Sequence, residues 1–317
     1  MNREGKFLVS WGLFTLVGGV TVSVLRQRFE VGVGAAQERL DHPRWHVAAF
    51  SGSTATTAYV DQGDGPAVLV LHENNGGWDQ AMNWAHRRLP TGFRIVAPSR
   101  FGYPGSSMPT GATTYGQGEA LLELLDHLGL DQVAVVALSA ASNVAARLVA
   151  AHPDRVRALV LESPVAPGHA AEHMPPELVT RLMLRNEYSF WALTRMPWLV
   201  GPATGANWKN LDEGERAELE DIMTTMTPVV PRAEGMLFDR LVAIPEIARD
   251  EVPWEQIKVP TLVVTAADAV VATPPADAEA LVDRLPNGRL LVMDSGGHLL
   301  LGNVETLRTE VGDFLRP

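Results

Sequence analysis

A serine stands where an apolar run in the sequence gives way to a stretch with helical character. In "VVALSAASN", residues 135–143, the apolar run ends at Leu138 and Ser139 follows directly. A serine hydroxyl becomes a nucleophile only when a base takes its proton and a third group fixes the tautomer of that base. Ser139 is therefore a candidate nucleophile, provided that the chain brings a histidine and a carboxylate to it.

The elements that would position Ser139 alternate between strands and helices. Short apolar runs predict buried strands at residues 56–60, 67–72, 93–98, 132–139, 158–163, 261–266 and 289–294. Helices are predicted by an i, i+3, i+4, i+7 stripe of leucines (121, 124, 125 and 128) and at residues 140–152, 275–285 and 305–315. The segment "DQGDGPA" predicts a hairpin turn that joins the first two of these strands. This alternation indicates an α/β fold, with a mostly parallel sheet covered by helices on both faces.

One interval breaks the alternation. Residues 164–256 are helix-like and hold four of the eight tryptophans and six of the ten methionines. We therefore predict a core made of residues 45–163 and 257–317, and a helical cap made of residues 164–256. The interval is either a helical subdomain with its own core or a cap whose adaptable methionine and aromatic face contacts an apolar substrate. Both descriptions can hold together.

Five fragments carry a resemblance to a known family. They are "LVLHENNGGWDQ", "GFRIVAPSRFGYPGSSMP", "LLDHLGLDQVAVVALSAASNVAARLVAAHPDRVRALVL", "IKVPTLVVTAAD" and "SGGHLLLG". In this order they make residues 45–317 resemble the α/β-hydrolase superfamily, in its capped serine hydrolase branch of esterase-like and lipase-like proteins. The resemblance implies that Ser139 is the nucleophile, His298 the base and Asp268 the group that orients the base.

The order of residues in that fold selects among the candidates. Nucleophile, acid and base arrive in this sequence, each on a loop after a strand. Four histidines follow Ser139, and only His298 lies beyond the last predicted strand. Asp268 follows the strand at 261–266, and we expect it to be the acid. The alternative acid is Glu162, at the end of the preceding strand, where some lipases place theirs.

The turn around Ser139 departs from the family motif. The nucleophile elbow reads G-x-S-x-G, and here Ala137 and Ala141 replace both glycines. In a tight strand-to-helix crossing the two extra methyl groups would cost about 1 to 3 kcal/mol, which a slightly wider crossing absorbs. The structural alternative is that Ser139 merely caps the helix at 140–152. Ser142, the other hydroxyl nearby, lies inside that helix.

The loop after His72 would supply part of an oxyanion hole. The expected donors are the N–H groups of Ala140 and Asn74, and "HENNGG" is similar to the loop of dienelactone-hydrolase-like relatives. A Glu73 carboxylate about 5 Å from the oxyanion would oppose it by roughly 3 kcal/mol. Glu73 therefore either points to solvent or lies in the pocket protonated or paired. Glu73 and Trp78 are the predicted pocket residues.

Composition excludes several classes of function. A net charge of -11 over 317 residues, with no cluster of basic and aromatic residues, argues against nucleic acid as a partner. The chain has no cysteine, which excludes disulfides, thiolate metal ligands and a cysteine nucleophile. Zinc-protease, P-loop and dinucleotide-binding motifs are also missing, so we predict no metal and no cofactor.

The N-terminal segment suggests a membrane anchor. "FLVSWGLFTLVGGVTVSVL", from Phe7 to Leu25, is uncharged, and as a helix it would reach roughly 28 Å. We therefore predict a transmembrane or signal-anchor segment at residues 1–29 and a polar tether at residues 30–44. Basic residues on both sides leave the membrane face undetermined. The alternative is a cleaved signal and a secreted protein.

Together these observations predict a membrane-anchored serine hydrolase. It would cleave a carboxylic ester or related acyl bond of a small apolar substrate through an acyl-enzyme on Ser139. A serine nucleophile disfavours epoxide hydrolase and haloalkane dehalogenase chemistry, which uses a carboxylate nucleophile. The alternatives are a serine-dependent C–C bond hydrolase or perhydrolase, and a catalytically weak or inactive ligand-binding module with the same fold.

Overall fold

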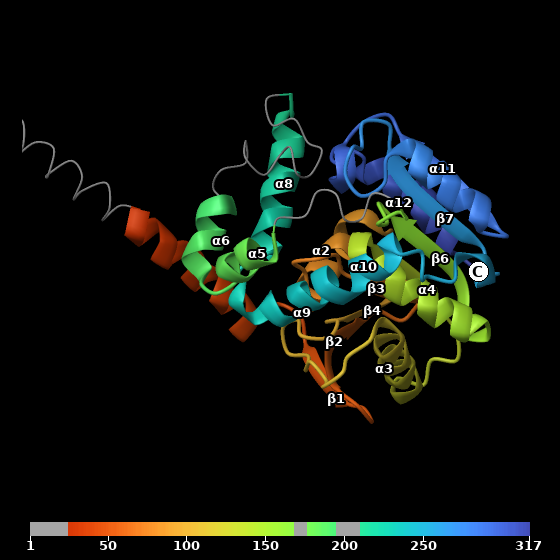
Figure 1. Ribbon diagram of the computed structural model, residues 1–317, viewed down its shortest axis with the longest axis horizontal. Coiled ribbons are helices and arrows are strands. Elements are labelled where there is room, and N and C mark those ends of the chain that lie inside the picture. Colours follow the sequence, from red (N-terminus) through yellow and green to blue (C-terminus); the bar gives the residue numbers. More distant parts are fainter. Residues whose placement is uncertain (1–24, 168–175, 195–209) are drawn as a thin grey trace, which may run out of the picture.

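The computed structural model describes residues 25–167, 176–194 and 210–317, which form an eight-stranded sheet and its covering helices (Figure 1). The strand order is β1-β2-β4-β3-β5-β6-β7-β8. The strands are β1 (Val47–Ser51), β2 (Thr56–Gln62), β3 (Ala67–Leu71), β4 (Arg94–Pro98), β5 (Val133–Leu138), β6 (Val156–Glu162), β7 (Thr261–Ala266) and β8 (Gly288–Met293). β1 pairs with β2, and β2 with β4, in antiparallel fashion, and every other neighbouring pair is parallel. All seven predicted strands are present, and β1 is an additional one.

The predicted hairpin between β2 and β3 is wrong. β2 pairs with β1 on one side and with β4 on the other, so β2 and β3 are not neighbours. The turn residues between β2 and β3 still reverse the chain locally. Strand pairing is decided by contacts far apart in the sequence, and the residues of a turn do not encode them.

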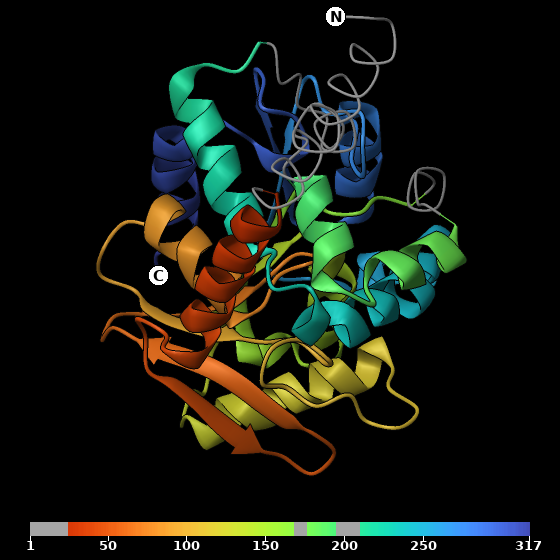
Figure 2. The same cartoon turned by 90° about the vertical axis from the view of Figure 1, so that its left-hand side faces the viewer.

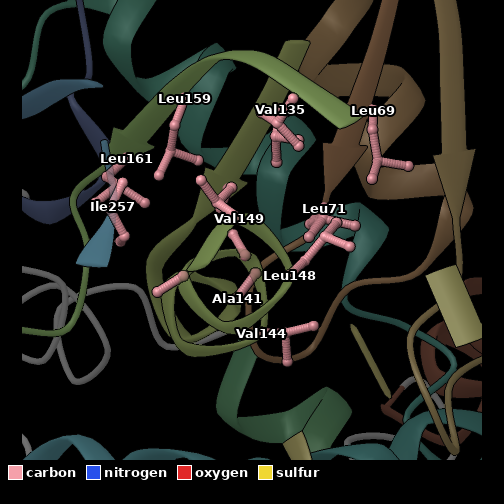
Figure 3. Packing of buried hydrophobic residues seen from close by; sticks show 14 of the residues in the cluster. Leu69, Leu71, Val135, Ala141, Val144, Leu148, Val149, Leu159, Leu161 and Ile257 are labelled. Atoms are coloured by element: carbon pink, nitrogen blue, oxygen red, sulfur yellow. The ribbon is translucent and has the colours of Figure 1, made fainter. Parts of the chain in front are cut away.

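Two layers of helices cover the two faces of the sheet. The core helices are α2 (Trp78–Arg88), α3 (Thr114–His127), α4 (Ser142–Ala151), α11 (Pro275–Arg284) and α12 (Val304–Leu315). α3, α4 and α11 pack into one apolar cluster, and α2 and α12 into the other. Side chains alternate across the sheet as the pleat requires, because Leu69 and Leu71 of β3 face the first layer while Val68 and Val70 face the second. Figure 3 shows the first layer around α4.

The described residues between β6 and β7 contain helices and no strand. They form α5 (Glu177–Met183), α6 (Glu187–Thr194), α8 (Glu213–Thr225), α9 (Ala233–Phe238), a π-helical turn (Asp239–Ala243) and α10 (Ile244–Ala248). We call this part the cap. α8 begins with a capping box, in which Asp212 accepts from the N–H of Glu215 and Glu215 accepts from that of Asp212. In Figure 1, α5, α6 and α8 stand to one side of the sheet, and α9 and α10 lead back to it.

The membrane prediction needs correction. Up to residue 24, the expected spanning segment lies outside the described residues. Among the helices that the structure does describe, none is both long enough and apolar enough to span a bilayer. The prediction of a membrane-anchored protein is therefore wrong on this finding.

The expected tether is helical. Residues 25–41 form one helix, shown in red beside the cap in Figure 2. Phe29 makes edge-on ring contacts with Tyr188 and Trp191, at centroid distances of 5.2 and 5.5 Å. Arg39 donates to the carbonyl oxygens of Thr224 and Thr227, at 2.6 and 3.0 Å. These contacts offset the helix-breaking tendency of the two glycines in this segment, Gly32 and Gly34, which costs about 1 kcal/mol each.

Candidate active site

Ser139 lies at the carboxyl end of β5, in the middle of the sheet. Its φ is +49°, in the left-handed region that a serine seldom adopts, and a short 3-10 turn leads from it into α4. The residue is 9% exposed. Backbone strain of this kind costs about 1 to 3 kcal/mol and persists only where the surrounding structure enforces it. A serine that merely capped α4 would have ordinary extended backbone instead.

The two alanines of the turn are accommodated by core packing. Ala137 and Ala141 are fully buried and belong to the same apolar cluster. Figure 3 shows Ala141, the last residue of the 3-10 turn before α4, in the layer that also contains Leu71, Leu148 and Val149. Each extra methyl group therefore fills space in the core, and the turn keeps its left-handed serine without the two glycines.

His298 shares a cavity with Ser139. It lies in the 3-10 turn Gly297–Leu299, which follows β8, and both side chains line a cavity of about 50 Å³. Nδ1 of His298 is buried and has no hydrogen-bond partner among the described residues. Burial lowers the pKa of His298 to about 4. The ring is therefore neutral at physiological pH, as a general base must be.

Asp268 holds the loop that carries His298. Its carboxylate, just after β7, accepts the N–H of Gly297 at 2.9 Å and that of Gly296 at 3.3 Å. Both glycines have positive φ, which explains the glycine pair in "SGGH". The predicted acid thus contacts the backbone beside His298 and makes no hydrogen bond to its ring.

Glu162, the alternative acid, is committed elsewhere. Its oxygens accept from Trp84 Nε1, at 2.9 and 3.0 Å, and from the Arg88 guanidinium. Burial raises the pKa of Glu162, although Arg88 opposes the shift. Glu162 lines the same cavity as His298 but has no hydrogen bond to it.

The two predicted pocket residues, Glu73 and Trp78, line different cavities. Glu73 is partly exposed and lines the cavity that contains Ser139 and His298. Trp78 is buried and lines a second cavity, of about 220 Å³, near the helix over residues 25–41. Asn83 and Thr225 line both cavities, so the two are adjacent.

Side chains and backbone of the loop after β4 hold the predicted oxyanion loop through buried hydrogen bonds. Arg100 donates through its backbone N–H to His72 Nε2, at 3.0 Å, and through Nε to the His72 carbonyl, at 3.1 Å. Tyr103 donates to the side-chain oxygen of Asn74 at 3.1 Å. The N–H of Glu73 donates to Gln80 Oε1 at 3.1 Å. The candidate oxyanion donor on this loop is therefore the next N–H group, that of Asn74.

Sequence reasoning missed three buried ion pairs that join the cap to the core. They are Arg88–Glu218, at 2.9 Å, Arg100–Asp239, at 2.5 Å, and Arg232–Asp79, at 2.7 Å. In each pair one partner belongs to the cap and the other lies on α2 or on the loop after β4. No local signal identifies them, because a charged residue in a helical pattern ordinarily marks a solvated face.

Glu73 makes the stability of the fold pH-dependent. Burial, and then the nearby Glu162, raise the pKa of Glu73 from 4.5 to about 7. The folded state then holds the proton more tightly than the unfolded chain does, so stability is lost as the pH rises from about 4.5 through 7. We expect Glu73→Gln to raise the free energy of unfolding by about 1 to 2 kcal/mol at pH 8, and to change it little at pH 5.

Urea unfolding of both proteins at the two pH values checks this expectation. The matched control is Glu305→Gln, because the Glu305 side chain is 82% exposed. An equal effect of Glu73→Gln at both pH values would contradict it.

No group of three or more histidine, aspartate or glutamate side chains in the described ranges is arranged to hold a metal ion.

Comparison with known proteins places the chain in a family. Residues 66–303 match the family model for the alpha/beta hydrolase fold. A putative carbamate hydrolase, RutD, from Caulobacter sp. (strain K31) is 28% identical over 256 residues, which are 77% of this chain and 90% of that protein. An alpha/beta hydrolase fold protein from Nakamurella multipartita has 27% identity and a TM-score of 0.65, covering 85% of this chain and 99% of that one. The enol-lactonase from Burkholderia xenovorans LB400 has 18% identity and a TM-score of 0.66 over 84% and 99%, and shows likeness of fold. With the strand order, the left-handed Ser139 and the family match in agreement, this chain is a member of the α/β-hydrolase family.

Proposed function

We propose that the protein is a serine hydrolase that cleaves an ester or related acyl bond through an acyl-enzyme on Ser139. One observation carries the proposal: a left-handed serine at the end of β5 shares a small cavity with a histidine that burial keeps neutral. A serine nucleophile needs that base, and the strained turn presents its hydroxyl to the cavity.

In the proposed reaction, His298 takes the proton of Ser139 as its oxygen bonds to the substrate carbonyl carbon. The N–H groups of Ala140 and Asn74 stabilise the oxyanion that forms. The bond to the leaving group breaks, and His298 returns the proton to the departing atom. Water then attacks the acyl-enzyme by the same route and releases the acid and free Ser139. Asp268 serves by fixing the loop on which His298 stands.

The size of the cavity favours a short acyl group. One water molecule needs about 10 to 15 Å³ of cavity volume. The cavity of about 50 Å³ therefore has room for about four water molecules, or for an acyl group of roughly four non-hydrogen atoms. Its lining combines apolar carbons of Trp84, Leu138 and Ile222 with charged groups. The carbamate hydrolase relative is named for a carbonyl substrate, which supports an acyl bond as the target.

Labelling with a fluorophosphonate tests the proposal. The full chain is treated with the probe, and the adduct is located by peptide mass spectrometry. We expect one adduct, on Ser139, and none in Ser139→Ala. Ser142→Ala is the matched control, since Ser142 is fully buried in α4, and it should label like the parent. Folded protein without a Ser139 adduct would point instead to a ligand-binding module without turnover.

A further inference from the structure

The cavity beside Ser139 contains more negative than positive groups. Three carboxyl groups line it, those of Glu73, Glu162 and Glu218, together with two guanidinium groups, those of Arg87 and Arg88. Three against two leaves one carboxyl group without a cation. Arg87 also pairs with Asp221, which lies outside this cavity. Its positive charge is therefore already shared with another carboxylate and does not offset the excess of negative charge in the cavity.

The unpaired carboxyl group is that of Glu73. Arg88 gives its N–H groups to Glu162, to Glu218 and to the Leu299 carbonyl. Glu73 Oε1 accepts from Gln80 at 3.0 Å, while Oε2 accepts no hydrogen bond from the part of the chain that the structure describes. Among the described residues Glu73 also has no ion pair. One of its oxygens is therefore open to a ligand in the cavity.

Ser163 provides a second open polar group in the same cavity. It follows β6 with a φ of +44°, and its N–H is bound to the Val264 carbonyl at 2.8 Å. The side chain is 4% exposed, and its buried hydroxyl has no hydrogen-bond partner among the described residues. A buried hydroxyl without a partner costs stability, which a bound polar group recovers.

We propose that Glu73 and Ser163 form a subsite for a protonated amine at the end of a short acyl chain held on Ser139. An ammonium group has three donors and no acceptor, so it can satisfy the Glu73 carboxylate and the Ser163 hydroxyl together. The leaving group must depart to solvent, whereas the acyl group stays on Ser139, so the small cavity, with its buried ion pairs, suits the acyl part. This inference rests on the proposed hydrolase function. It adds a substrate class, short amino-acyl esters and amides.

The steady-state test compares methyl 3-aminopropanoate with methyl butanoate, in which a methyl group replaces the ammonium. The parent protein should favour the amine by about 10- to 100-fold in kcat/KM at pH 8, the range of a charge-assisted hydrogen bond. Glu73→Gln should reduce this ratio at least 10-fold, and Ser163→Ala about 5-fold. Glu305→Gln removes the same charge from an exposed site and should keep the parent ratio. A parent ratio near one, or a ratio that Glu73→Gln does not change, would overturn the inference.

A binding test separates this inference from the hydrolase proposal. Ser139→Ala protein is titrated with 3-aminopropanamide and with butanamide in a calorimeter. We expect the amine to bind at least 10-fold more tightly, and this preference to be lost in the Ser139→Ala, Glu73→Gln double variant. If the parent protein hydrolyses neither ester through Ser139 but the Ser139→Ala protein still binds the amine more tightly, the hydrolase proposal fails and the amine subsite stands. If methyl butanoate is hydrolysed through Ser139 but the amine has no preference, the subsite fails and the hydrolase proposal stands.

Discussion

Ser139→Ala should lower kcat for a short ester by about 10⁶-fold, with little change in the free energy of unfolding. Removing the nucleophile of a serine hydrolase leaves only the contribution of the oxyanion hole and of binding. Alanine lacks only the hydroxyl group, and the left-handed backbone at this position stays equally strained. Steady-state kinetics on methyl butanoate measure the loss, and urea unfolding confirms that the variant is folded.

The double variant Ser139→Ala, His298→Gln sharpens this test. If the two residues act as one unit, the second substitution should add almost nothing to the first, because base catalysis has no purpose without the nucleophile. Losses that multiply would mean that Ser139 and His298 act independently. His298 would then not be the base that activates Ser139.

Asp239→Asn should lower the free energy of unfolding by about 3 to 5 kcal/mol. Arg100 and Asp239 are completely buried, and two hydrogen bonds of 2.5 and 2.6 Å join them. Tyr103 donates to the same carboxylate at 2.6 Å. Loss of the aspartate charge leaves the Arg100 cation buried without its counter-charge, which is far more costly than never burying the pair. Urea unfolding at pH 7 gives the value.

Two further variants make that measurement decisive. Glu251→Gln removes one partner of the exposed pair Arg249–Glu251 and should cost no more than about 1 kcal/mol. Arg100→Leu combined with Asp239→Leu removes both charges and should be less destabilised than Asp239→Asn, because an apolar pair needs no counter-charge. A cost below 1 kcal/mol for Asp239→Asn would show that water reaches Arg100.

The sequence predicted those features that follow from local pattern. Continuous apolar runs such as "VAVVAL" mark strands that are buried on both faces, and the order of Ser139, Asp268 and His298 along the chain follows the strands. The position of Ser139 between a strand and a helix follows from the apolar run before it, whereas its left-handed backbone is known from the structure alone. The contacts of these side chains were not predictable, and Asp268 binds the loop amides where a bond to the His298 ring was implied.

What sequence reasoning missed depends on contacts between distant parts of the chain. The helix over residues 25–41 contains two glycines and is stabilised by contacts with the cap nearly two hundred residues away. The sequence likewise left two alternatives for the Glu73 side chain, solvent or pocket. The choice between them depends on its contact with Gln80 and on the elements that pack around the loop. The membrane prediction depended on the composition of residues 7–25, and no helix in the described ranges is long and apolar enough to support it.

The three buried ion pairs between cap and core also bear on how a substrate enters. Swinging the cap away as a hinged lid would separate Arg88 from Glu218, Arg100 from Asp239 and Arg232 from Asp79 in a single motion. Such an opening would break three buried ion pairs at once and expose their charges to water, although Arg88 would keep Glu162. With the cap closed, Asn83 and Thr225 stand between the cavity beside Ser139 and the adjacent cavity near the helix over residues 25–41. In this closed arrangement the spacing between these two side chains limits which molecules can pass from one cavity to the other.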